Sequence, residues 1–125
     1  MTLSFTILSG DYAIARLPYD ALVPSWADGA GLVTITRALD ELSITCLSDR
    51  IPADVTAQTG WAALRIDTLA DLDAAGVVIA AVTPVSTAGY GVFVISSHLR
   101  DHLLVRHIHL DAVTSALTQA GHNVA

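Results

Sequence analysis

The stretch that decides the fold is ADLDAAGVVIAAVTPVSTAGYGVFVISSHLRDHLLV, residues 70–105. It carries no formally charged residue between Asp73 and Arg100, a length that on its own would suffice to cross a bilayer. Turn-forming residues, Pro84 and Gly89 among them, divide it into shorter pieces, and no Lys/Arg cluster flanks it. We therefore expect a buried helix followed by a buried strand, and no membrane span.

The apolar run after Asp73 predicts a helix over residues 73–88. Asp73 can cap this helix by accepting hydrogen bonds from the unpaired amides of its first turn, and Asp71 is the alternative cap. Pro84 lacks an amide donor and is expected to kink the last turns, while Gly89 can take the left-handed conformation that ends a helix. The helix is apolar on every side, so we expect it to be covered on more than one face.

The second half of the chain alternates between strand and helix patterns. β-branched and aromatic runs predict strands on both sides of the first helix, and an apolar stripe predicts a second helix that ends at Gly121. The predicted elements are strand 61–66, helix 73–88, strands 91–97 and 102–106, helix 110–120 and a short strand over 122–125. This order, βαββαβ, is the ferredoxin-like α+β arrangement, in which both helices cover one face of an antiparallel sheet.

The first half is a reduced version of the same unit. Its predicted strands are residues 3–8, 12–17, 32–37 and 42–47. Only one helical turn fits between them, anchored by Trp26, and no second helix is evident. The turn-rich connector over residues 49–60 is the natural boundary. We therefore predict a degenerate module over residues 1–58 and a complete module over residues 59–125.

Four short motifs follow one another around the predicted helix. They are Asp-x-x-Gly-Val at 73–77, Ala-Gly at 88–89, Ile-Ser-Ser at 95–97 and Asp-His-Leu-Leu-Val at 101–105. Their order resembles the ACT domain, and in particular short tandem-ACT proteins related to aspartate kinase regulatory domains and CASTOR-type amino-acid sensors. The resemblance implies a non-catalytic regulatory protein, without a cofactor, that holds an amino acid at an interface between ACT modules.

The resemblance also implies a ligand site, and the chemistry of the residues suits it. Backbone amides at a helix start, here around Gly76, favour a carboxylate because the helix dipole is positive there. A carboxylate such as Asp101 favours an ammonium group. The residues expected at the ligand are Asp73, Ala75, Gly76, Val77, Ile95, Ser96, Ser97 and Asp101.

Simpler roles stay open for the same residues. Asp73 is equally well explained as a helix cap, and Asp101 as a turn former. Arg100 favours a ligand with an acidic side chain whereas Asp101 favours a basic one, so the sequence leaves the amino acid open. The five histidines form no metal-binding motif, and Cys46 lies mid-strand among apolar neighbours, as a packed core thiol does.

The composition indicates self-association. Apolar residues make up 53% of the 125 residues and the mean hydropathy is +0.57, high for a small soluble monomer. In the ferredoxin-like order, residues 92–95 form a flat, apolar edge strand, and an open edge of this kind invites aggregation. We expect this edge to pair with the hairpin of the first half or with a second chain, which makes a homodimer the expected assembly.

The charge and the first residues bound the cellular setting. Twelve acidic residues face six arginines and no lysine, so the net charge of −6 disfavours nucleic acid and membrane surfaces as partners. The first ten residues lack the basic start of a signal peptide, and a single cysteine allows no internal disulfide, so a cytoplasmic location is expected. Three functions remain: a sensor acting on an unidentified partner, a structural interaction module, and a small enzyme with no recognisable catalytic constellation.

Overall fold

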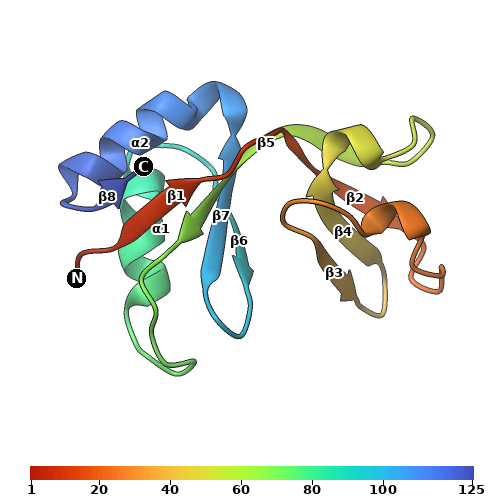
Figure 1. The fold of residues 1–125 in the computed structure, drawn as a ribbon, viewed down its shortest axis with the longest axis horizontal. Helices are drawn as coiled ribbons and strands as arrows, with labels where there is room; N and C mark the ends of the chain where they lie inside the picture. Colours follow the sequence, from red (N-terminus) through yellow and green to blue (C-terminus); the bar gives the residue numbers. More distant parts are fainter. The chain divides into compact units, whose positions relative to one another are not determined.

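The computed structural model describes all 125 residues, which divide into two compact units (Figure 1). The 9–61 unit contains residues 9–61, and the helical unit contains residues 1–8 together with residues 62–125. One long strand, β5 (Ala57–Ile66), contributes its first residues to the 9–61 unit and its last residues to the helical unit. No helix has the length and apolar character needed to cross a bilayer.

The helical unit has the predicted βαββαβ order with one strand added. Besides the end of β5, its elements are β1 (Ser4–Ile7), α1 (Val77–Thr87), β6 (Phe93–Ser96), β7 (Asp101–Arg106), the 3-10 turn η3 (His107–His109), α2 (Leu110–Gln119) and β8 (Asn123–Val124). The strands lie side by side in the order β6, β7, β5, β1, β8. The fold is therefore α+β and ferredoxin-like, as predicted from the sequence.

The added strand, β1, departs from the predicted division at residue 58, which placed residues 1–8 in the first module. In the structure, Phe5 of β1 pairs with Ile66 of β5 in an antiparallel ladder and with Val124 of β8 in a parallel one. Leu3 and Phe5 are fully buried in the core of the helical unit. The alternating apolar residues of β1 thus complete the sheet beneath the helices.

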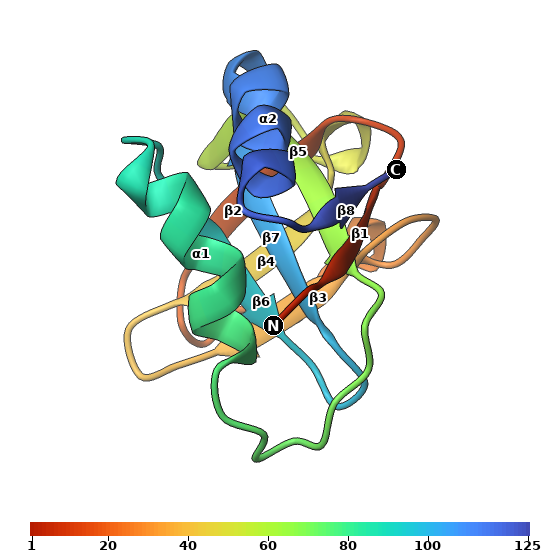
Figure 2. The same cartoon turned by 90° about the vertical axis from the view of Figure 1, so that its left-hand side faces the viewer.

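Both helices cover one face of this sheet (Figures 1 and 2). The shared core contains buried side chains from three strands and from both helices: Leu3, Phe5, Ala62, Leu64, Ile66, Leu103 and Val105 from the strands, Ala81 and Val85 from α1, and Val113 and Leu117 from α2. Burial of each large apolar side chain contributes about 1.5–3 kcal/mol. Ala120, the last residue of the helix predicted over 110–120, lies beyond the end of α2 at Gln119 and is exposed.

Helix α1 starts later than predicted. Gly76 precedes its first residue with φ +91°, a left-handed conformation that breaks the helix before Val77. Asp73 therefore lies outside the helix in an exposed turn and does not cap it, and the amide of Ala74 bonds to the Asp71 carbonyl at 3.0 Å. The other end is as predicted: Gly89, at φ +93°, ends α1, and its amide donates to the Ser86 carbonyl at 2.9 Å.

The 9–61 unit has the same antiparallel strand order with its helices reduced to single turns. Its elements are β2 (Tyr12–Leu17), the 3-10 turn η1 (Ser25–Ala27), β3 (Thr34–Arg37), β4 (Leu42–Leu47), the 3-10 turn η2 (Ser48–Arg50) and the start of β5. The strands lie in the order β3, β4, β2, β5, and each neighbouring pair is antiparallel. The second helix, predicted to be absent, is represented by η2.

In the 9–61 unit, side-chain hydrogen bonds to the backbone stabilise the segment that joins β2 to β3. Arg50 donates to the carbonyls of Trp26, Ala27 and Ala30 at 3.2, 3.4 and 2.8 Å. Tyr12 accepts a hydrogen bond from the Leu32 amide at 3.0 Å. The buried core is small and consists of Ala15, Ala27, Leu42, Ile44 and Cys46.

Candidate functional site

The candidate site is a recess at the start of α1, which we call the helix-start recess. Its lining comes from the loop that joins β5 to α1, from the first turn of α1 and from the turn between β6 and β7. Figure 2 shows the backbone of these three segments. Its volume is about 170 Å³. The lining residues are Thr68, Ala70, Asp71, Leu72, Val77, Val78 and residues 96–101.

Half of the predicted ligand residues line this recess. Val77 contributes from α1, and Ser96, Ser97 and Asp101 contribute from the β6–β7 turn and the strand ends beside it, although at least 19 positions separate the two groups in the sequence.

The other four predicted residues lie elsewhere. Asp73 and Ala75 are exposed in the loop before the helix, outside the lining, and Ile95 is half-buried in β6. Gly76 lines a second recess, between the two helices and the chain start. Asp73 and Ala75 are displaced because α1 begins at Val77, which leaves both residues in the loop before the helix.

The first turn of α1 offers backbone donors to the recess. No side chain caps the helix, and its first helical hydrogen bond joins the Ala80 amide to the Gly76 carbonyl at 3.0 Å. The amides of Val77 and Val78 precede that bond and have no acceptor within the helix. Together with the helix dipole they favour an anionic group in the recess.

The β6–β7 turn presents hydroxyls and carboxylates. The Ser97 amide and its Oγ both donate to the Arg100 carbonyl, at 3.2 and 2.8 Å, so Ser97 fixes the shape of the turn. Ser96 and Asp101 face each other as the last pair of the β6–β7 ladder. Asp101 and, from the loop before α1, Asp71 both line the recess, and their carboxylates make it attractive to an ammonium group.

Arg100 is tied to the end of β5. Its Nη1 atom lies 3.4 Å from the Ile66 carbonyl and 3.5 Å from the Asp67 carbonyl, and 3.6 Å from Asp67 Oδ1. Asp67 Oδ2 accepts a hydrogen bond from Thr6 at 2.5 Å, and Oδ1 accepts one from Arg65 at 2.6 Å. The Thr6 hydrogen bond, followed by Arg65 and Arg100, lowers the pKa of Asp67. The charge of Arg100 is thus partly compensated inside the protein.

His102 lies in β7 directly after the turn. It is 9% exposed, and its Nδ1 atom has no hydrogen-bond partner. Burial, and after it the positive charges of Arg100 and Arg65, lower the pKa of His102. The neutral ring is therefore the form that the fold favours.

The remaining reactive residues are placed away from the recess. Cys46 is a buried free thiol in the 9–61 unit, and burial raises its pKa, although Arg50 opposes the shift. A raised pKa disfavours the thiolate that a nucleophile needs. No group of three or more His, Cys, Asp or Glu side chains is arranged to hold a metal ion.

The sequence placed the expected ligand residues at the helix start and the hairpin turn, but it did not predict the whole lining of the recess. Thr68, Leu72, Val78, His98 and Leu99 border the recess and were not predicted to do so. Their signal is position: Thr68, Leu72, His98 and Leu99 lie in the two connections beside the helix start and at the hairpin turn, and Val78 lies in the first turn of α1. Placing them required the start of α1 and the reach of the loop over residues 67–76.

Comparison with known proteins decides the family. Residues 56–119, more than half of the chain, match the ACT domain family. The chain belongs to the ACT domain family. Residues 10–54 match a second family, described as an N-terminal domain, and this range falls within the 9–61 unit. A search of curated proteins gave no significant match.

Solved structures show the same fold across the whole chain. An Agobacterium tumefaciens protein is 44% identical, with a TM-score of 0.95 over 100% of this chain and 93% of that one. A Vibrio cholerae protein, described as a possible transport protein of unknown function, is 18% identical, with a TM-score of 0.72 over 95% and 90%. The regulatory subunit of aspartate kinase from Thermus flavus is 12% identical, with a TM-score of 0.62 over 97% of both chains.

Proposed function

We propose that this ACT-domain protein is a non-catalytic regulatory module that binds a free amino acid in the helix-start recess. The observation that carries the proposal is the meeting of opposite chemistries in one small space. Uncapped amides of α1 lie on one side, and the carboxylates of Asp71 and Asp101 line the same recess. An amino acid carries one carboxylate and one ammonium group, and it satisfies both.

The volume of the recess supports a ligand of this size. Sites for drug-sized molecules usually measure about 300–1,000 Å³, whereas this recess measures about 170 Å³. A nucleotide or a folded peptide would exceed it. The apolar side chains of Leu72, Val78 and Leu99 at its border, all exposed, provide contacts for a ligand side chain.

A second copy of the chain is the partner that best completes the site. Strand β6 pairs with β7 only, so its other edge carries no strand of the same chain. Phe93 on this edge is 38% exposed, and Leu99 in the adjoining turn is 56% exposed. We expect a homodimer that covers this edge and encloses a ligand at the interface. Such a ligand stabilises the assembly that forms its site, which gives regulation a physical basis.

A binding screen tests the proposal. Isothermal titration of the full chain with each common amino acid should identify one ligand or a small group of related ligands. Asp101→Asn, which keeps the side-chain size, should weaken that ligand at least about tenfold, since a charge-assisted hydrogen bond contributes about 1.5–3 kcal/mol. Asp40→Asn, an exposed change in the 9–61 unit, is the matched control and should leave the affinity unchanged.

The alternative function is a structural interaction module whose recess holds no ligand. The exposed apolar residues around the recess favour it as the second candidate, because they suit a protein interface without a small molecule. The same screen separates the two. If the chain forms dimers in sedimentation analysis and no amino acid gives binding heat in the titrations, the structural role is supported and the sensor proposal is contradicted.

A further inference from the structure

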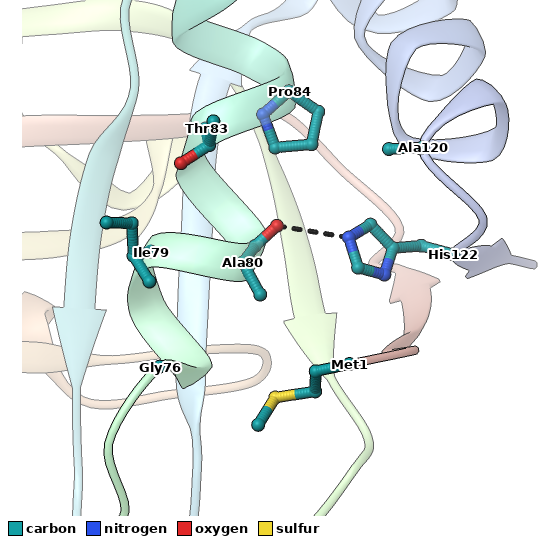
Figure 3. A pocket seen from close by; sticks show the side chains of 8 residues that line it. All are labelled: Met1, Gly76, Ile79, Ala80, Thr83, Pro84, Ala120 and His122. Carbon is teal, nitrogen blue, oxygen red and sulfur yellow. Dashed lines mark hydrogen bonds between the residues drawn. The ribbon is translucent and has the colours of Figure 1, made fainter.

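His122 lies where the two chain ends meet helix α1. It is 6% exposed, directly precedes β8, and its ring packs edge-on against Phe5 with centroids 5.8 Å apart. Its Nδ1 atom accepts a hydrogen bond from the Leu3 amide at 2.9 Å. Its Nε2 atom lies 3.0 Å from the Ala80 carbonyl oxygen (Figure 3).

These two contacts define the state of the ring. An amide can only donate, so Nδ1 must carry no proton, and a carbonyl can only accept, so Nε2 must carry one. His122 is therefore a neutral imidazole with its proton on Nε2. A ring proton on Nδ1 would face the Leu3 amide donor to donor.

The Ala80 carbonyl is the one that Pro84 leaves without its usual donor. In an α-helix the carbonyl of residue i accepts from the amide of residue i+4, which for Ala80 is residue 84. Proline has no amide hydrogen, so that bond cannot form. Figure 3 shows Ala80 and Pro84 on the side of α1 that faces His122. A dashed line joins the Ala80 carbonyl oxygen to Nε2 of the His122 ring.

We propose that His122 is a positioning residue that replaces the main-chain donor missing at Pro84. It thereby ties α1 to β1 and β8. Ala80, whose carbonyl His122 contacts, also bonds through its amide to the Gly76 carbonyl, so this residue adjoins the turn whose Val77 and Val78 line the helix-start recess. The effect on ligand affinity rests on the proposed function, whereas the hydrogen-bond replacement does not.

Two substitutions divide the roles of the ring. His122→Asn can place an acceptor near the position of Nδ1 but is too short to reach Ala80. His122→Gln can place a donor near the position of Nε2 but leaves the Leu3 amide unpaired. Each is made in the natural chain and in Pro84→Ala, where the new amide of residue 84 can bond to the Ala80 carbonyl. Urea unfolding is measured for all six proteins.

The proposal predicts a specific coupling. His122→Asn should raise the unfolding equilibrium constant about tenfold in the natural chain, the usual effect of one lost hydrogen bond, and less than about twofold in Pro84→Ala. His122→Gln should have the same effect in both backgrounds. An equal effect of His122→Asn in the two backgrounds would overturn the proposal.

A spectroscopic measurement on the unmutated protein covers the case in which a variant does not fold. The ring nitrogen shifts of His122 at neutral pH should show a neutral imidazole protonated at Nε2. The opposite tautomer, or a charged ring, would overturn the proposal. If an amino acid binds, the affinity lost in His122→Asn should return in the double variant. If none binds, the unfolding cycle still decides the role of His122.

Discussion

The two units share a strand order and differ in what covers their sheets. In the 9–61 unit, β3, β4, β2 and β5 follow the ferredoxin-like order, but 3-10 turns of three residues stand where helices would be. In the helical unit, helices of 11 and 10 residues cover the equivalent strands. Strand order alone therefore does not create the helix-start recess, which is bordered by the first turn of α1. Only the unit with a full helix presents uncapped amides beside a hairpin turn.

The difference in cover predicts a difference in how each unit is stabilised. Helices bury apolar side chains, whereas short turns leave loop carbonyls that need another donor. In the helical unit the cover is Ala81, Val85, Val113 and Leu117. In the 9–61 unit a single guanidinium, that of Arg50, bonds to three loop carbonyls.

The largest expected effect on the free energy of unfolding comes from truncating a helix side chain that packs against the sheet. Leu117→Ala should lower the free energy of unfolding by about 2–5 kcal/mol, because the side chain is fully buried and its loss leaves a cavity. Ile108→Ala, at a position 87% exposed, is the control and should change it by less than about 0.5 kcal/mol. Urea denaturation measures both. Equal effects would show that α2 does not stabilise the unit by burial.

An intermediate effect is expected where Arg50 takes the place of a helix. Arg50→Lys keeps the charge but loses the planar donor group, and should cost about 1–3 kcal/mol. Amide hydrogen exchange should accelerate in residues 24–31, the segment that contains the three carbonyls to which Arg50 donates. Arg16→Lys, an exposed arginine of the same unit, should have little effect on either measurement. Unchanged exchange in Arg50→Lys would remove the basis for this part of the comparison.

The smallest effect is a dependence of stability on pH in the helical unit. The lowered pKa of His102 means that the unfolded chain binds this proton more readily, so stability is full above the unfolded value near 6.5 and declines below it. The lowered pKa of Asp67 acts at lower pH: its contribution is present above the unfolded value of 3.8 and is lost as the pH falls through the folded value.

Two substitutions assign these pH windows. His102→Gln should flatten the decline in stability below about pH 6.5. Asp67→Asn should flatten the decline in stability near about pH 4 and below. Urea midpoints across this range measure both. A natural chain that becomes more stable on acidification through the first window would contradict the role of His102.

The sequence predicted the family, the strand order and the helical unit because these depend on local patterns. Alternation in residues 32–37 and 42–47 specifies β3 and β4, and Gly89 and Gly121 specify the helix ends. Two features were not predictable in this way. The insertion of β1 beside β8 depends on contacts between residues about 120 positions apart.

The start of α1 is the other feature, and it explains why Asp73 and Ala75 do not line the helix-start recess. Asp73 is a suitable cap by residue type, but Gly76 takes a left-handed conformation and moves the start to Val77. A sequence shows that glycine permits this conformation without showing that it is used. The turn residues Ser96, Ser97 and Asp101 were predicted at the ligand, and the structure brings them to the same recess as Val77.

Amino-acid binding in the helix-start recess is tested most directly by an amide NMR titration of the full chain with the common amino acids. At least one of them should shift the amide resonances of Val77 and Val78 together with those of residues 97–101, and Asp101→Asn should weaken this response. Absence of shifts at both places with every amino acid, in a folded protein, would contradict it, as would shifts confined to residues 9–61.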